Sequence, residues 1–112
     1  MMKANKYHSV RIQDISIKNV GGHVVVSGWV ENIRDHGGVL FLDLRDTSAT
    51  IQTVSNDDNL FKGIAKESCI RLEGTIRQRD EETYNERLTT GEVELLVEKL
   101  DILSPSLHYL QF

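Results

Sequence analysis

The sequence predicts an all-β domain, and three observations lead to this fold class. Five stretches rich in β-branched and other apolar residues alternate with turn residues. Two of these stretches flank Gly37-Gly38, a pattern typical of a hairpin. One short helical pattern falls between the third and fourth stretches. Five strands with a helix in that place is the element order of an OB-fold, a small Greek-key barrel.

The elements follow one another with little sequence left between them. Residues 1–22 form a mostly polar lead-in, in which 15–20 could be a single helical turn or an arm crossing the barrel. The barrel domain is expected over 23–103, and 104–112 resembles a hinge or linker. Residues 59–66 are expected to form the short helix, with Leu60, Phe61 and Ile64 on one side. Strands are expected over 24–32, 39–46, 50–54, 69–79 and 93–103.

Length and composition are those of one soluble domain. The chain has 112 residues, of which 39% are hydrophobic and 27% charged, so it can bury one modest core. It has no apolar run long enough to cross a bilayer and no apolar signal core near residue 1, so a cytosolic location and no membrane partner are expected. The single Cys69 fits a reducing compartment. The four histidines are far apart and no CxxC occurs, so no metal site is expected.

The charge balance argues against nucleic acid at first sight. The net charge is −4, whereas proteins that depend on phosphate contacts are usually basic. Many acidic residues are clustered, at 57–58, 80–82 and 92–98. The arginines fall elsewhere, in or beside expected strands, so a locally positive face is compatible with the sequence. These arginines are Arg34, Arg45, Arg71, Arg77 and Arg79.

Alternation along the second expected strand separates two faces. Leu40, Leu42 and Leu44 point one way and are expected in the core. Phe41 points the other way, on the face that carries Asp43 and Arg45. An aromatic ring among polar groups on a sheet is typical of a stacking platform for an unpaired base. A Phe packed under a neighbouring loop explains the pattern equally well.

The same parity argument gathers four side chains on one outer face, namely Phe41, Gln52, Arg79 and Glu94. An aromatic ring, an amide, a cation and a carboxylate are the groups that can read Watson–Crick edges of splayed bases. Parity does not place Arg34, but a turn or a bulge could bring it to this face. A solvated charged face with cross-strand pairs is the alternative for Glu73, Arg77 and Arg79.

Specific motifs now suggest a family. Residues 28–30 (GWV), 34–38 (RDHGG) and 41–46 (FLDLRD) closely resemble the N-terminal anticodon-binding OB domain of aspartyl-tRNA synthetases. The resemblance continues through 51–52, 74–79 and 85–94, and 104–106 with 110–112 resemble the family's hinge. It runs from about residue 7 to 112. Asparaginyl and lysyl synthetases carry related OB domains but lack the run from RDHGG to DLRD.

The resemblance implies recognition of the anticodon loop of aspartate tRNA. By this resemblance Phe41 would stack on the middle anticodon base, and Gln52 and Arg34 would hydrogen-bond it. Glu94 would read the first base, and Arg79 would contact the same nucleotide or its phosphate.

Two further positions bear on whether asparagine tRNA is also accepted. His36 resembles the relaxed bacterial type, which takes both tRNAs, and a neutral imidazole can donate to or accept from either kind of base edge. Glu82 matches neither the relaxed nor the strict type.

The chain also departs from the family. Many members have three basic residues where this chain has Asn32, Ile33 and Arg34, and Thr83 stands where some bacterial members have an Asn. The class II catalytic core that would follow the hinge is absent. No cofactor is therefore expected in this chain, and ATP and Mg²⁺ would belong to a full-length synthetase. A catalytic domain would be a partner within a longer chain, and the oligomeric state stays open.

Two other function classes remain open on the residues alone. The first is an enzyme using Asp43, Asp46 and His36, but the two aspartates alternate to opposite faces of one strand and do not easily converge. The second is a free-standing OB-fold module that binds single-stranded nucleic acid or a protein. The negative net charge slightly favours a protein partner.

Overall fold

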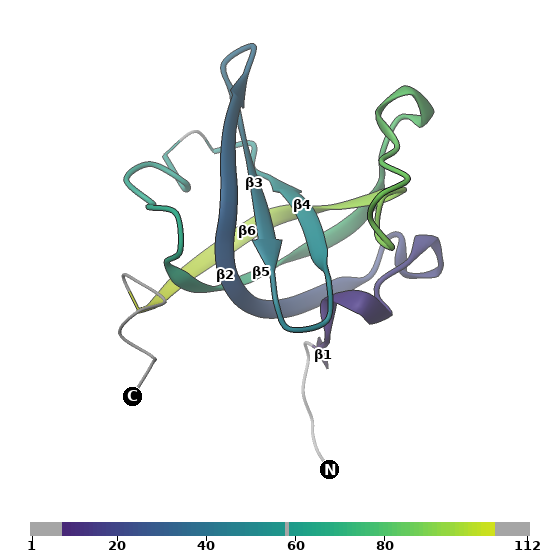
Figure 1. Ribbon diagram of the computed structural model, residues 1–112, viewed down its shortest axis with the longest axis horizontal. Coiled ribbons are helices and arrows are strands. Elements are labelled where there is room, and N and C mark those ends of the chain that lie inside the picture. The colour runs from purple at the N-terminus through teal and green to yellow at the C-terminus, as the bar shows by residue number, and fades with distance from the viewer. Residues whose placement is uncertain (1–7, 58, 105–112) are drawn as a thin grey trace.

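A single sheet closes on itself to form a barrel (Figure 1). The computed structural model describes residues 8–57 and 59–104. Neighbouring strands follow the order β1-β2-β3-β4-β6-β5, and β2 also pairs with β5, which closes the barrel. The strands are β1 (His8–Ser9), β2 (His23–His36), β3 (Val39–Arg45), β4 (Thr50–Val54), β5 (Cys69–Gln78) and β6 (Val93–Ser104).

The expected all-β OB-fold class is confirmed, with strand ends that differ by a few residues. β2 continues to His36 instead of ending at Asn32, so the hairpin with β3 is longer than expected. Gly37 and Gly38 form its turn with φ of 63° and 86°, the left-handed backbone that a two-residue hairpin turn requires. The two-residue strand β1, parallel to β2, was not expected.

A bulge in β2 decides which side chains of this strand face outward. Before the bulge, even-numbered residues such as Val26 and Val30 point into the core. The pairing with β3 then shifts between Val30 and Asn32, which inserts one extra residue. After the shift Ile33 packs against the core and Arg34 lies opposite Phe41 in the ladder. The bulge therefore brings Arg34 to the outer face, where parity alone did not place it.

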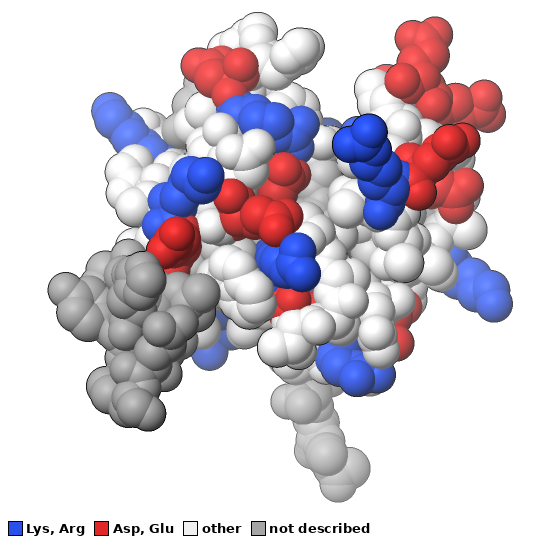
Figure 2. Space-filling model, in the orientation of Figure 1, with Lys and Arg blue, Asp and Glu red and all other residues white. Residues whose placement is uncertain are grey.

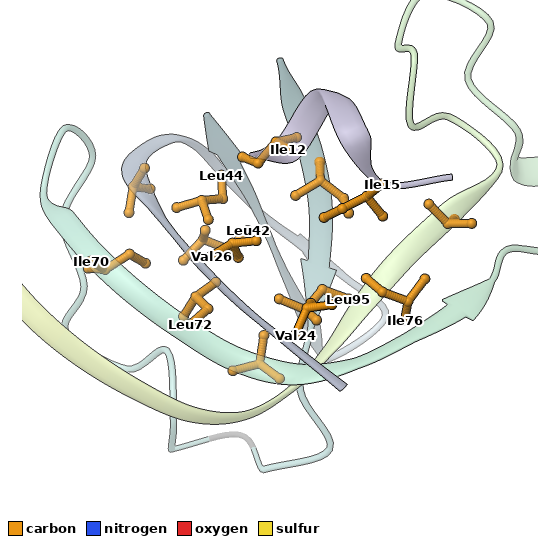
Figure 3. Close-up of a cluster of buried hydrophobic side chains, with 14 of the residues drawn as sticks. Ile12, Ile15, Val24, Val26, Leu42, Leu44, Ile70, Leu72, Ile76 and Leu95 are labelled. Atoms are coloured by element: carbon orange, nitrogen blue, oxygen red, sulfur yellow. The ribbon is translucent and has the colours of Figure 1, made fainter. Parts of the chain in front are cut away.

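The core fills the barrel with aliphatic side chains that alternate along the strands. Leu42 and Leu44 of β3 are fully buried, as alternation predicted. The lead-in also contributes, because Ile12 and Ile15 are buried in the same cluster (Figure 3). Ile12 is the first residue of the 3-10 turn η1 (Ile12–Asp14), Ile15 follows its last residue, and η2 (Ile17–Asn19) comes next. The lead-in therefore contributes two side chains to the core.

The segment between β4 and β5 differs from the expected regular helix. Its described residues form consecutive turns in which backbone N–H groups reach carbonyls three residues back, as from Ile64 to Phe61. Gly63 has φ of 81°, which is incompatible with a continuing right-handed helix. The expected apolar side is nevertheless kept: Phe61 is buried, and Leu60 and Ile64 pack against the core.

The remaining segments lie at the ends of β6. Before it, residues 79–92 form a long loop, which contains the 3-10 turn η3 (Glu81–Thr83). After it, the expected linker and the hinge-like motifs at 105–112 lie outside the described residues. Within the part of the chain that the structure describes, no helix is long and apolar enough to cross a membrane.

Candidate nucleic-acid interface

An open groove of about 680 Å³ lies between the β2–β3 hairpin and the loop that joins β5 to β6. In Figure 1 the hairpin projects at the top of the view and the loop lies at the right. Residues of strands β3, β4, β5 and β6 also line it. The groove is lined by six of the seven residues that the sequence singled out: Arg34, His36, Phe41, Gln52, Arg79 and Glu94.

Strand register explains why these side chains meet. Arg34 lies opposite Phe41 in the β2–β3 ladder, and Asp43 lies opposite Gln52 in the β3–β4 ladder. Directly opposed residues of antiparallel strands project from the same face of the sheet. The parallel pairing of β4 with β6, at Thr53 with Leu95, then brings Gln52 next to Glu94. Residues far apart in sequence thus form one row across the barrel surface.

Hydrogen bonds connect this row from end to end. Arg34 Nη2 donates to Asp43 Oδ1 at 2.7 Å and to Gln52 Oε1 at 3.0 Å. Gln52 Nε2 donates to Glu94 Oε1 at 2.8 Å. The other carboxylate oxygen of Glu94, Oε2, accepts from Arg77 Nε at 2.7 Å. The polar groups are therefore held in fixed positions before any ligand arrives.

Phe41 forms part of the groove wall and is half-buried. The guanidinium carbon of Arg34 lies 5.6 Å from the centre of its ring, within the range of a cation–π interaction. Val39 and Val54 add apolar surface to the same groove. The ring therefore lies on the outer face, as strand parity predicted, while Leu42 beside it is fully buried.

Arg79 carries an unused donor at the groove. Its Nε is buried, and no residue in the described part of the chain accepts a hydrogen bond from it. Burial lowers the pKa of the Arg79 guanidinium below its ordinary value; the carboxylates of Glu94 and Asp43 oppose this shift, and Arg34 adds to it. Arg79 also lines a smaller hollow next to the groove. A buried N–H without an acceptor favours a ligand that supplies one.

The two residues expected to influence tRNA choice lie in different places. His36 is exposed at the end of β2 and lines the groove. Glu82 is exposed in η3 and is not among the lining residues, whereas its neighbour Thr83 is. The loop therefore presents Thr83 rather than Glu82 to the groove.

Sequence reasoning did not single out Asp43 and Arg77 as members of the site. Asp43 binds Arg34, and Arg77 lies opposite Glu94 in the β5–β6 ladder. Arg77 forms the cross-strand pair that the sequence allowed for a charged face, but it also lines the groove. An expected antiparallel pairing of β5 with β6 could have placed Arg77 beside Glu94 and so revealed its position in the groove.

Asp46 has a separate, structural role. Its side chain accepts hydrogen bonds from the backbone N–H groups of Ile12, Ser48 and Ala49 and from the Ser48 hydroxyl. Burial raises the pKa of the Asp46 carboxyl, but these hydrogen bonds outweigh burial, so the pKa lies below its ordinary value. Asp46 joins the β3–β4 turn to the lead-in, while Asp43 binds Arg34 in the groove network.

Charges of both signs are mixed on this surface. Figure 2 shows basic and acidic side chains interspersed, with acidic ones gathered over the loop between β5 and β6. The network itself contains Arg34 and Arg77 with Asp43 and Glu94, so its formal charges cancel. Within the described residues, no group of three His, Cys, Asp or Glu side chains is placed to hold a metal ion.

Comparison with known proteins gives a consistent result. A sequence profile of the OB-fold nucleic acid binding domain family matches residues 24–103. An aspartate–tRNA(Asp/Asn) ligase of Roseobacter denitrificans is 40% identical over 104 residues, which is 89% of this chain. The chain spans 18% of that relative's length.

Solved structures agree with the sequence comparison. Asparaginyl-tRNA synthetase from Pyrococcus horikoshii, solved with asparaginyl-adenylate, matches 85% of this chain and 22% of its own, with a TM-score of 0.69 and 27% identity. An aspartyl-tRNA synthetase from Entamoeba histolytica matches 88% of this chain and 21% of its own, with a TM-score of 0.74. Because the two sequences are only 22% identical, this likeness is evidence for the fold alone.

Proposed function

The chain belongs to the OB-fold nucleic acid binding domains, as a relative of the anticodon-binding domain of aspartate–tRNA ligases, and from this we propose that it binds the anticodon loop of aspartate tRNA. Single-stranded loops are recognised by stacking their splayed bases on aromatic rings and by hydrogen bonds to base edges. The groove offers both kinds of group within one row of side chains.

The observation that carries the proposal is the hydrogen-bonded row beside Phe41. Arg34, Gln52 and Glu94 are held by one another and still line an open groove. Fixed donors and acceptors lose little side-chain entropy when a base binds, which favours recognition. The buried, unpaired Nε–H of Arg79 adds a donor that an acceptor on the RNA would satisfy.

We assign each residue a role in this complex. Phe41 stacks on the middle anticodon base, and Arg34 and Gln52 hydrogen-bond the Watson–Crick edge of that base. Glu94 reads the first base by accepting from its amino group, and Arg79 contacts the same nucleotide or its phosphate. In these assignments the middle base contacts Gln52 and the first base contacts Glu94, and a hydrogen bond of 2.8 Å joins these two side chains.

The proposed reader also accepts asparagine tRNA. Aspartate and asparagine anticodons differ at the third base, and His36 is the groove residue that we place near it. An exposed imidazole discriminates poorly, because it can donate to one base and accept from another. The relative from Roseobacter denitrificans is named for both tRNAs, which agrees with this breadth.

In a longer chain this domain would act beside a class II catalytic domain in an aspartate–tRNA ligase. ATP and Mg²⁺ would bind to that catalytic domain, in the cytosol. The alternative is a free-standing OB-fold module that binds single strands or a protein, and the net charge of −4 is the observation that favours a protein partner.

Binding measurements with three RNAs test the proposal. The aspartate anticodon stem-loop, an unrelated stem-loop and a poly-pyrimidine strand are titrated into the protein at fixed salt by calorimetry. We expect the aspartate loop to bind at least about tenfold more tightly than either of the others, a difference of about 1.4 kcal/mol. Equal affinity for all three RNAs would support a general single-strand binder instead. No binding to any of them would leave the protein-partner alternative.

A further inference from the structure

We propose that Glu94 locks the side-chain amide of Gln52 in one orientation, and that this lock makes the groove choose uracil over cytosine at the base that Gln52 contacts. The inference rests on the proposed function, because it concerns the same groove. In it Glu94 acts as a positioning residue for the middle base, in addition to its proposed contact with the first base.

The two neighbours of Gln52 determine which way its amide points. Arg34 has donors and no acceptor, so the group facing Arg34 Nη2 at 3.0 Å must be the Oε1 acceptor. The carboxylate oxygen of Glu94 accepts, so the group facing it at 2.8 Å must be the Nε2 donor. A flipped amide would set two donors against each other at Arg34 and two acceptors against each other at Glu94. Both ends of the row therefore favour the same orientation.

Burial makes the wrong orientation costly. Gln52 is 6% exposed and Glu94 is 8% exposed, so little water is present to compensate a flipped amide. The outer partners hold both ends in place: Asp43 binds Arg34 at 2.7 Å, and Arg77 binds the second oxygen of Glu94 at 2.7 Å. The amide orientation is thus set by four charged groups rather than by contact with RNA.

The locked amide presents a pattern that matches one pyrimidine. After its two network bonds, Gln52 still has one N–H and one oxygen lone pair. Asp43 and Gln52 use the two N–H groups of Arg34 Nη2, so the donor at this end of the row is another N–H group of the guanidinium. Read from Arg34, the row offers this donor, then the Oε1 acceptor, then the Nε2 donor. The Watson–Crick edge of uracil is acceptor, donor, acceptor, which is complementary at all three places. The flipped amide would offer donor, donor, acceptor, which complements the acceptor, acceptor, donor edge of cytosine.

The lock is tested by Glu94→Gln, which replaces one carboxylate oxygen of residue 94 by an NH₂ group. In Glu94→Gln the Nε–H of Arg77 holds the new amide oxygen, so the new NH₂ donor faces Gln52. Either orientation of Gln52 then sets one pair of donors against each other, at residue 94 or at Arg34, and neither orientation is favoured. Two stem-loops are compared that differ in the middle anticodon base alone, uracil or cytosine. Because both share the same first base, any lost contact between residue 94 and that base cancels in the ratio of the two dissociation constants. Glu98→Gln makes the same change on β6 at an exposed position that does not line the groove, and serves as the matched control.

We expect the wild type and Glu98→Gln to prefer the uracil loop by about tenfold or more, and Glu94→Gln to bring the two affinities within about threefold. An unchanged ratio in Glu94→Gln, while the wild type prefers uracil, would overturn the lock and leave the proposed function standing. A wild type that binds neither loop better than an unrelated RNA would instead contradict the proposed function.

The free protein supplies a readout that needs no RNA. In the wild type, the Nε2 protons of Gln52 should give their strongest nuclear Overhauser cross-peaks to the side chain of Glu94 and not to the guanidinium of Arg34. In Glu94→Gln, cross-peaks from both orientations should appear. Wild-type cross-peaks of equal strength to Arg34 and Glu94 would mean that the amide is free to flip, and would overturn the proposal whatever the RNA result.

Discussion

Phe41→Ala separates a stacking role from a core role, because two adjacent residues of β3 face opposite ways. Phe41 is half-buried in the groove wall, and Leu42 is fully buried in the core. Removing the ring leaves the barrel core and the polar row of the groove in place. The main loss within the free protein is the contact between the ring and the Arg34 guanidinium, at 5.6 Å.

The expected magnitudes follow from these positions. Full burial of a Phe side chain stabilises a protein by about 1.5–3 kcal/mol, so a half-buried one should contribute roughly half of that to the free energy of unfolding. Stacking of a base on an aromatic ring is worth about 1–3 kcal/mol per base, so binding of the aspartate stem-loop should weaken by that amount. Leu42→Ala should cost about 2–5 kcal/mol of unfolding free energy, because it leaves a cavity in the core.

Urea unfolding and calorimetric titration with the aspartate stem-loop measure the two quantities on the same samples. Phe41→Ala should remain folded and bind weakly, whereas Leu42→Ala should lose far more stability than Phe41→Ala does. If Phe41→Ala unfolds as readily as Leu42→Ala, the ring belongs to the core. If it binds the stem-loop as tightly as the wild type, the ring is not a stacking platform.

Four other outcomes are expected. Because the charges of the groove network cancel, the slope of log affinity against log salt should be about −2 to −4 for a single-stranded loop, and a slope steeper than about −6 would reveal a basic surface elsewhere. The aspartate and asparagine stem-loops should bind within about tenfold of each other, or about 1.4 kcal/mol, and a hundredfold preference for the aspartate loop would assign strict recognition to residues other than His36. Arg79→Gln should weaken binding of the aspartate loop with little effect on unfolding, since its Nε has no acceptor among the described residues; unchanged affinity would exclude a contact with RNA. Asp46→Asn should cost about 1–3 kcal/mol of unfolding free energy, because its amide would set a donor against the Ile12 N–H. Folding lowers the pKa of Asp46, so this contribution is present above the unfolded-state pKa and is lost as the pH falls through the lower folded-state value. The difference in unfolding free energy between wild type and Asp46→Asn, measured by urea unfolding, should therefore shrink below about pH 4. A difference that widens there would contradict this role of Asp46.

Alternation along single strands was readable from the sequence, and it predicted the face of the sheet on which several of these side chains lie. Leu42 and Leu44 are in the core and Phe41 is in the groove because side chains of a strand alternate between faces. The same argument brought Gln52 and Glu94 to one surface. Strand parity depends on local backbone geometry, which the pattern of residue types reports directly.

Features that depend on irregular geometry or on contacts between distant strands were harder to predict. The bulge between Val30 and Asn32 turns Arg34 outward, and neither residue type signals a bulge. The hydrogen bond between Gln52 and Glu94 depends on the parallel pairing of β4 with β6, which joins residues 42 positions apart. Asp43 and Arg77 gained their importance from partners in other strands.

Two local structures differ from expectation for reasons that the sequence contains. Gly63 adopts a left-handed backbone and interrupts the segment expected to be a helix. In the polar lead-in, Ile12 and Ile15 are three residues apart, so the 3-10 turn η1 directs both side chains to the same side, into the core. The sequence analysis did not place Ile12 and Ile15 in the core, because most residues around them in the lead-in are polar.

In the proposed complex, the groove beside Phe41 is the surface that receives the anticodon loop. A nuclear magnetic resonance titration of the ¹⁵N-labelled protein with the aspartate stem-loop tests it most directly. The largest shifts should fall on the Arg34 and Arg79 side-chain Nε–H groups, the Gln52 side-chain amide and the backbone amide of Phe41, while the backbone amides of His23 and Glu73, which do not line the groove, should stay unchanged. Shifts centred on His23 and Glu73, with the groove signals unmoved, would mean that RNA binds another face of the barrel.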